Sequence, residues 1–251
     1  MRIGIAKDCD SLTTANTIDP SGAPRRRALM SYRTALFAFI LLPLAVYAQD
    51  AIKRDEHQMH GLHNDPKAYI GALDDPKRDA YQNPQEVLAA LDIKPGEIIA
   101  DIGAGSGYFT FRLARHVSER GTIYAVDVSP DMILHINRAI RDLKVTNVVS
   151  ILADPDDPLL PVASVNRFFF SDSWHHIENQ TKYLSLMKKL LKPNGEVVMI
   201  DFHKKDLPVG PPMQMKIARE DLIKQMESHD FRLAKEHTFL PYQYFLVFLV
   251  K

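Results

Sequence analysis

Apolar residues from position 83 onwards fall into two alternating patterns. Short continuous apolar runs predict β-strands that are buried on both faces of a sheet. Stretches with helical spacing of apolar residues separate these runs, and two of them begin at a capping residue followed by proline. The predicted strands are 98–102, 122–127, 148–152, 168–170, 196–201, 231–237 and 242–250. The predicted helices begin at Pro84, capped by Asn83, and continue at 108–117, 130–143, 179–191 and 219–228.

Strands that alternate with helices form βαβ units, whose strands lie parallel in a sheet covered by helices on both faces. The last two strands are separated only by a tight link at Leu240-Pro241, so they must pair antiparallel. The pattern therefore predicts an α/β fold with a doubly wound, mostly parallel seven-stranded sheet and an antiparallel last strand.

The first fifty residues have the pattern of an export signal. Three arginines at 25–27 precede an apolar run at 35–48, which is shorter than the roughly 20 residues of a membrane-spanning helix. Small residues at Val46 and Ala48 suit positions −3 and −1 of a signal-peptide cleavage site. We expect cleavage after Ala48 and an exported (periplasmic or secreted) protein with no stable membrane span. An uncleaved signal that anchors the chain in the membrane is the alternative.

The chain divides into three parts on this basis. Residues 1–48 form the signal peptide, and Met30 is a plausible true start, so the extension before it would be misannotated. Residues 49–82 form a polar segment or lid, expected to be irregular because it contains the pairs Asp65-Pro66 and Asp75-Pro76. Residues 83–251 form the main domain.

A histidine-rich cluster near the predicted mature N-terminus has the spacing H-x-M-H-x-x-H. It comprises His57, Met59, His60 and His63, side chains that suit copper or, less well, zinc. The spacing matches no strong metal signature, and a polar solvated tail is the favoured interpretation. We therefore predict no metal site.

Charge and cysteine content exclude several classes of function. The 251 residues carry 31 Lys+Arg and 31 Asp+Glu, so no cationic surplus is available to hold nucleic acid or an anionic membrane surface. The single cysteine, Cys9, excludes an intrachain disulfide, a Cys-rich zinc site and a CxxC redox motif. A small molecule is the expected partner.

A glycine-rich loop follows the first predicted strand and opens the next helix. Gly103, Gly105 and Gly107 allow the backbone to turn sharply and to approach a ligand closely. The dinucleotide fingerprint G-x-G-x-x-G would need a third glycine where Tyr108 stands. The second strand ends at Asp127, where a carboxylate can accept both ribose hydroxyls of a nucleoside cofactor.

Four motifs together resemble class I S-adenosylmethionine-dependent methyltransferases, and the branch that includes ubiquinone/menaquinone-biosynthesis C-methyltransferases is the most similar. The motifs are Asp101-x-Gly-x-Gly-x-Gly, Tyr124-Ala125-Val126-Asp127, Trp174-His175-His176-Ile177 and Leu191-Lys192-Pro193-Asn194-Gly195. The resemblance covers about 83–251 and implies a Rossmann-like methyltransferase fold with S-adenosyl-L-methionine as cofactor. It says little about the substrate.

The resemblance also implies roles for individual residues at the first two strands. Asp101 would lie near the amino group of the cofactor's methionine portion. Gly103, Gly105 and Gly107 would line the cofactor, and Asp127 would bind the ribose.

Four further residues complete the implied cofactor site. Asp154, after the third strand, would reach the adenine amino group. Ser171 and Asp172, after the fourth strand, would lie beside the methionine portion. Tyr81 resembles an aromatic lid over it.

Methyl transfer requires a base only if the acceptor has a proton to lose. His175 and His176 follow the fourth strand and His203 follows the fifth, at the sheet edge where α/β proteins bind ligands. We predict His175 or His176 as the base, although one of the pair is expected simply to pack. Arg78 would either clamp an anionic acceptor or lie exposed on the surface.

Three functions remain open from the sequence. The first is an exported S-adenosylmethionine-dependent methyltransferase that acts on an unidentified small molecule. The second is a non-catalytic exported module that binds a nucleoside or S-adenosylmethionine. The third, an NAD-dependent oxidoreductase, is weakened by the missing third glycine.

Overall fold

The computed structural model describes residues 65–251. The expected signal peptide and its cleavage site, the alternative start at Met30 and the histidine cluster at 57–63 lie outside the described residues. Within 65–251, none of the helices combines the length and the apolar character needed to cross a membrane.

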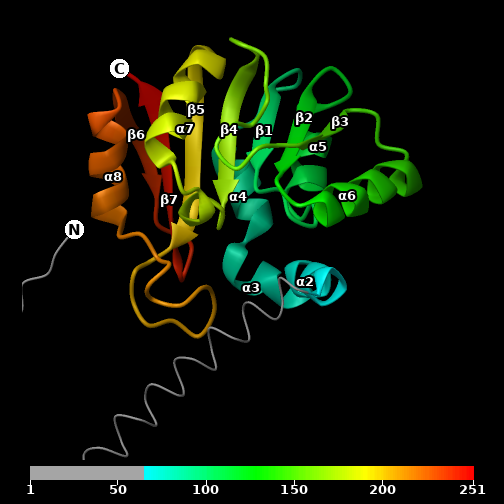
Figure 1. The fold of residues 1–251 in the computed structure, drawn as a ribbon, viewed down its shortest axis with the longest axis horizontal. Coiled ribbons are helices and arrows are strands. Elements are labelled where there is room, and N and C mark those ends of the chain that lie inside the picture. The colour runs from blue at the N-terminus through cyan, green and yellow to red at the C-terminus, as the bar shows by residue number, and fades with distance from the viewer. Residues whose placement is uncertain (1–64) are drawn as a thin grey trace, which may run out of the picture. The chain divides into compact units, whose positions relative to one another are not determined.

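A single seven-stranded sheet forms the centre of the described domain, in the order β3-β2-β1-β4-β5-β7-β6 (Figure 1). The strands are β1 (Ile98–Ile102), β2 (Thr122–Asp127), β3 (Val148–Leu152), β4 (Val165–Ser171), β5 (Leu191–Phe202), β6 (Phe231–His237) and β7 (Gln243–Val250). The pairs from β3 through β5 are parallel, and β7 pairs antiparallel with both β5 and β6. The predicted fold class is therefore confirmed, including the antiparallel last strand.

Helices cover both faces of the sheet, as continuous apolar strands require. One face packs against α4 (Pro84–Leu91), α5 (Thr110–Val117) and α6 (Pro130–Leu143). The other packs against α7 (Gln180–Leu190) and α8 (Arg219–Ser228). Alternate residues of one strand serve the two cores, since Phe169 packs with the first group and Phe168 and Phe170 with the second.

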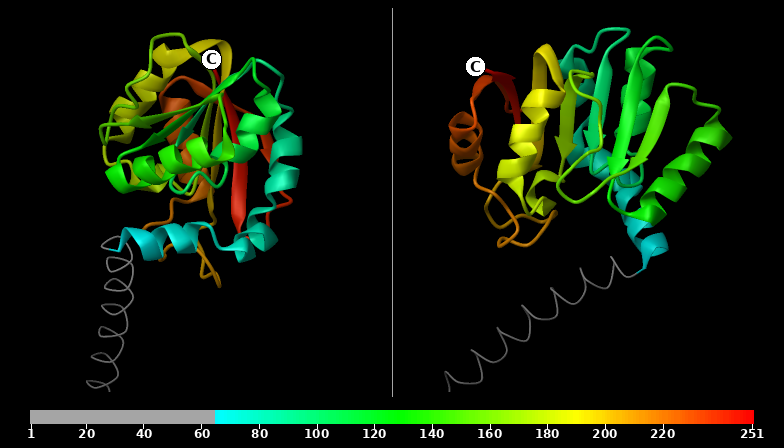
Figure 2. Two further views of the ribbon diagram at one scale, coloured as in Figure 1. Left: turned by 90° about the vertical axis from the view of Figure 1, so that its right-hand side faces the viewer. Right: turned by 45° about the horizontal axis from the view of Figure 1, so that its top comes forward.

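The described part of the segment expected to be irregular, residues 65–82, is mostly helical instead. It contains α2 (Pro66–Leu73), the 3-10 turn η1 (Pro76–Arg78) and α3 (Asp79–Gln82). The Asp-Pro pairs start helices here, because Asp65 accepts hydrogen bonds from the amides of the first turn and proline tolerates the first helical position. These short helices lie across the carboxyl end of the parallel strands (Figures 1 and 2).

Two local predictions in the main domain are confirmed only in part. Asn83 is at the N-cap position of α4 and Pro84 is its first residue, as predicted, but Asn83 is left-handed, with φ 40°, and its side chain makes no capping hydrogen bond. The strand predicted at 196–201 begins earlier, because β5 also includes 191–195. Its pairing with β4 is irregular between Leu191 and Glu196, where Asn194 is left-handed, with φ 63°. By contrast, Ser129 caps α6 as predicted.

Replacing Phe169 with alanine tests the importance of the central strand. Its ring is fully buried and packs edge-on against Phe109 with centroids 5.0 Å apart. We expect Phe169→Ala to lower the free energy of unfolding by about 3–5 kcal/mol, because it leaves a cavity in the core. Chemical denaturation measures this, with Leu143→Ala, at an exposed helix end, as a control within about 0.5 kcal/mol of wild type. A Phe169→Ala loss as small as the control's would contradict this packing.

Candidate cofactor and acceptor site

A cavity of about 640 Å³ opens at the carboxyl end of the parallel strands. Four carboxylates line it, each at or just after the end of a different strand: Asp101 on β1, Asp127 on β2, Asp154 after β3 and Asp172 after β4. The structure thus brings together the four acids that the sequence assigned to one cofactor. Ser171, Tyr81, Gly103 and Gly105 line the same cavity.

The glycine loop forms one wall of the cavity because only glycine fits its backbone. Gly103 and Gly105 have φ values of +70° and +56°, and a side chain at Gly103 would collide with Ser173. Gly107 was predicted to line the cofactor but is not among the residues that line the cavity. It has φ +87° and faces Phe111, so it shapes the turn into α5 from behind.

Asp127 is held in place by backbone amides. The amide of Gly105 donates to its Oδ2 at 2.8 Å, and that of Ser129 donates to its Oδ1 at 2.9 Å. Burial raises the pKa of Asp127 above its usual value, although these amide bonds oppose the rise. Each oxygen retains a lone pair, which suits the paired hydroxyls of a ribose.

Asp101 is buried at the end of β1 and accepts a hydrogen bond from one side chain. It is 3% exposed, and Thr110 donates a hydrogen bond to its Oδ2 at 2.6 Å. Burial raises the pKa of Asp101 to about 7, against the opposing effect of the Thr110 hydroxyl. A cation nearby would restore the ionised form, as expected of a carboxylate that receives an ammonium group.

Asp172 is clamped between two amide side chains that the sequence did not single out. Gln82 of α3 donates to its Oδ2 and Gln243 of β7 donates to its Oδ1, both at 2.6 Å. Its backbone is left-handed, with φ 56°. Burial raises the pKa of Asp172 to about 7, and the neighbouring charge of Asp201 adds to the rise.

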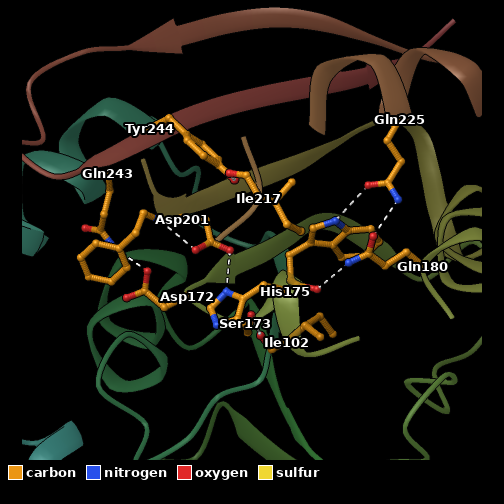
Figure 3. Close-up of polar contacts among 12 residues, drawn as sticks. Ile102, Asp172, Ser173, His175, Gln180, Asp201, Ile217, Gln225, Gln243 and Tyr244 are labelled. Atoms are coloured by element: carbon orange, nitrogen blue, oxygen red, sulfur yellow. Dashed lines mark hydrogen bonds and ion pairs between the residues drawn. The ribbon is translucent and has the colours of Figure 1, made fainter. Parts of the chain in front are cut away.

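Figure 3 shows a fifth acid, Asp201 of β5, paired with His175. The His175 Nδ1 lies 2.8 Å from the Asp201 Oδ2, and the amide of Phe202 donates to Oδ1 at 2.8 Å. Burial lowers the pKa of His175, but the hydrogen bond and charge of Asp201 outweigh it and the net direction is upward. An acid directly after the apolar run at 197–200 was the available sequence signal for Asp201.

The three candidate histidines have different positions. His175 and His176 both line the cavity, with ring centroids 4.2 Å apart. His203 is not among the lining residues, and its ring packs edge-on against Tyr244 at 5.8 Å. Burial lowers the pKa of His203. The structure therefore does not place His203 in the cavity lining.

The short N-terminal helices contribute Tyr81 and Arg78 to the cavity lining. Tyr81 packs near Phe202, with ring centroids 6.0 Å apart. Arg78, which the sequence left as either a clamp or an exposed residue, is half-buried and lines the cavity. Its Nη2 donates to Gln82 at 2.9 Å, its Nη1 donates to a backbone carbonyl, and its guanidinium lies 4.2 Å from the centroid of the Tyr108 ring.

The residues present suit S-adenosylmethionine. Its sulfonium and ammonium charges match the carboxylates, and its ribose and adenine match acids at the ends of β2 and β3. In addition, the Ser171 hydroxyl is buried at the cavity and makes no hydrogen bond within the described residues. An unsatisfied buried hydroxyl at this position points to a polar ligand.

Comparison with known proteins assigns the family. A family model for the methyltransferase domain matches residues 93–240, which is more than half of the chain. The chain therefore belongs to the methyltransferase-domain family, and its cofactor is S-adenosyl-L-methionine.

Individual relatives are similar over part of their length. The chain is 29% identical over 122 residues to the ubiquinone/menaquinone biosynthesis C-methyltransferase UbiE of Vibrio cholerae, covering 48% of this chain and 45% of the relative. It is 30% identical over 115 residues to the 2-phytyl-1,4-naphtoquinone methyltransferase of Trichormus variabilis, covering 44% and 49%. The chain thus spans about half the length of these curated relatives.

A solved structure matches more of the chain. The S-adenosylmethionine-dependent methyltransferase of Aquifex aeolicus is 26% identical, with a TM-score of 0.71 over 74% of this chain and 99% of that one. This agreement supports the Rossmann-like methyltransferase fold that the sequence motifs implied.

The raised pKa of Asp101 gives a testable pH dependence. The usual pKa of an aspartate is near 3.8, and that of Asp101 in the folded protein is about 7. At pH values between these two, the folded protein binds a proton at Asp101 that the unfolded chain does not. The contribution of this group to the stability of the ligand-free protein is therefore largest at acidic pH and is lost as pH rises through about 7. Asp101→Asn should remove that loss.

Chemical denaturation at several pH values measures the effect in wild type, Asp101→Asn and a control, Asp221→Asn, at an exposed position. We expect the stability advantage of Asp101→Asn over wild type to grow with pH, and the control to follow wild type. An unchanged difference between wild type and Asp101→Asn across this range would contradict the burial argument.

Proposed function

We propose that the protein is an enzyme that transfers a methyl group from S-adenosylmethionine to a small-molecule acceptor. The observation that carries this proposal is the convergence of four carboxylates, from four adjacent strand ends, on one cavity. Bound there, S-adenosylmethionine supplies a methyl group already activated on a positively charged sulfur. The protein's own contribution is then to bind, orient and exclude water.

The residues divide this work between the two halves of the cavity. Asp127 and Asp154 would hold the ribose and adenine, and Asp101 and Asp172 the methionine portion. The cavity is also lined by Tyr81, Ile177, Phe202, Pro211 and Met215, which are mostly apolar. Such a lining favours an apolar or aromatic acceptor. The quinone-directed relatives named above are consistent with this, at low identity.

Calorimetry with S-adenosylmethionine, S-adenosylhomocysteine and NAD tests the cofactor assignment. We expect binding of the first two ligands, and we expect Asp127→Ala to weaken it by about 1–3 kcal/mol because a charge-assisted hydrogen bond to the ribose is lost. Asp142→Ala, on the exposed face of α6, is the matched control and should bind as wild type does. Tight NAD binding without heat from S-adenosylmethionine would refute the proposal.

Conversion of S-adenosylmethionine to S-adenosylhomocysteine distinguishes an enzyme from a non-catalytic binding module. A module would bind both S-adenosylmethionine and its demethylated product but would never convert one to the other. The enzyme should produce S-adenosylhomocysteine in the presence of acceptors such as those used below.

We also propose that the protein is exported through an N-terminal signal cleaved after Ala48. Support comes from the basic residues at 25–27 and the short apolar run at 35–48. N-terminal sequencing of the protein from its native host should give Gln49 as the first residue. A mature protein that begins upstream of Ala48 would contradict cleavage at this site. Recovery of that longer protein from the membrane fraction would favour the anchored alternative.

A further inference from the structure

The pairing of His175 with Asp201 gives the cavity a base of defined orientation. Both side chains are almost fully buried, at 3% and 1% exposed. The hydrogen bond to Asp201 makes Nδ1 the donor, so in the neutral ring Nε2 carries the free lone pair. Nε2 points away from Asp201 (Figure 3) and His175 lines the cavity, so this lone pair is available on the ligand side.

His176 lines the same cavity and has an interaction of its own. It is the more exposed of the two residues, and its ring lies beside that of His175. The base is assigned to His175 because a buried acid fixes the orientation of its ring.

The remaining charges limit what kind of acceptor can enter. The carboxylates of the cavity repel an anionic acceptor, and Arg78 is committed to Gln82, a backbone carbonyl and the Tyr108 ring. An amine would be held by the same carboxylates in its protonated form, which has no lone pair to react. A sulfide would need no base at all. A weakly acidic hydroxyl on an aromatic body satisfies both the apolar lining and the positioned base.

We propose that His175 is the general base for a neutral acceptor with a phenol-like hydroxyl, and that Asp201 is the positioning residue for His175. This proposal rests on the proposed function and adds the acceptor class to it. The acceptor oxygen forms a bond to the methyl carbon while the bond from that carbon to sulfur breaks, leaving its electron pair on sulfur. The hydroxyl proton passes to the Nε2 of His175.

The charge balance of this step favours the same residues. The positive charge that sulfur loses reappears on the His175 ring, where the Asp201 carboxylate stabilises it. The groups facing His175 that affect its titration are Asp201 on β5, Asp172 at the end of β4, His176 on η2 (Trp174–His176) and, beside Asp201, Tyr244 on β7. Because one positive charge is lost at sulfur and one is gained at His175, the net charge of the cavity is the same before and after transfer.

Steady-state kinetics with two phenols of one ring size test the proposal. The probes are p-cresol, whose hydroxyl remains protonated at neutral pH, and p-nitrophenol, which is ionised at mildly alkaline pH. Formation of S-adenosylhomocysteine is measured for wild type, His175→Gln, Asp201→Asn and a control variant, His116→Gln. Calorimetry with S-adenosylhomocysteine establishes for each variant that the fold and cofactor site are intact.

With p-cresol we expect His175→Gln to lower kcat by at least about 100-fold, the usual contribution of a general base. The control His116→Gln, at an exposed position of α5 that does not line the cavity, should stay within a few-fold of wild type. With p-nitrophenol at mildly alkaline pH, wild type and His175→Gln should have similar kcat values, because this acceptor has no proton to give up. Repulsion of the anion by the cavity carboxylates should raise KM equally for both proteins. A structural role for His175 would impair both acceptors equally.

The pH profile reports on Asp201 separately. The reaction needs neutral His175, so kcat with p-cresol should rise with pH through the pKa of His175. Because Asp201 raises that pKa, Asp201→Asn should move the rising limb to lower pH while lowering kcat. An unmoved limb would overturn the positioning role.

Two other outcomes would overturn the inference. The first is equal loss with both phenols in His175→Gln. The second is a wild-type protein that binds S-adenosylmethionine but methylates neither phenol. A wild type that binds neither S-adenosylmethionine nor its product would instead refute the proposed function itself, so the two failures are distinguishable.

Discussion

The concentration of negative charge at one edge of the sheet is the constraint on which the site depends. Carboxylates that are buried close together raise one another's pKa and cost free energy when they ionise. Asp101 and Asp172 both have pKa values of about 7, mainly through burial. A ligand that brings positive charge to this edge relieves that cost. The parallel topology imposes the concentration, because it places the ends of neighbouring strands side by side.

The amide side chains around Asp172 connect this charge to the rest of the fold. Gln82 comes from the short N-terminal helices and Gln243 from the antiparallel strand β7, and both donate to Asp172. Gln82 in turn accepts from Arg78. The short N-terminal helices are thus hydrogen-bonded to Asp172, a carboxylate that also lines the cavity. The position of these helices and the position of this charge therefore depend on the same contact.

The main domain could be predicted because its signals are local. Apolar runs, glycines and capping residues placed the strands near their observed bounds, and the ends of β1 and β2 placed Asp101 and Asp127. The errors occurred where one residue type has two local meanings. Asp65-Pro66 and Asp75-Pro76 were interpreted as helix breakers, but each starts a helical turn in which the aspartate accepts amide hydrogen bonds. Asn83 likewise suits both a cap and the left-handed conformation that it adopts.

The sequence by itself determined the fold class, the order of the elements and the acids at the strand ends, because a strand fixes where its own last residues lie. Only the tertiary structure decided which distant residues meet. Asp201 lies 26 positions from His175 and Gln82 lies 90 from Asp172, so no spacing along the chain relates them. These contacts arise from the sheet order and from the packing of the N-terminal helices. Among them is the pairing of His175, one of the candidate histidines, with the buried Asp201.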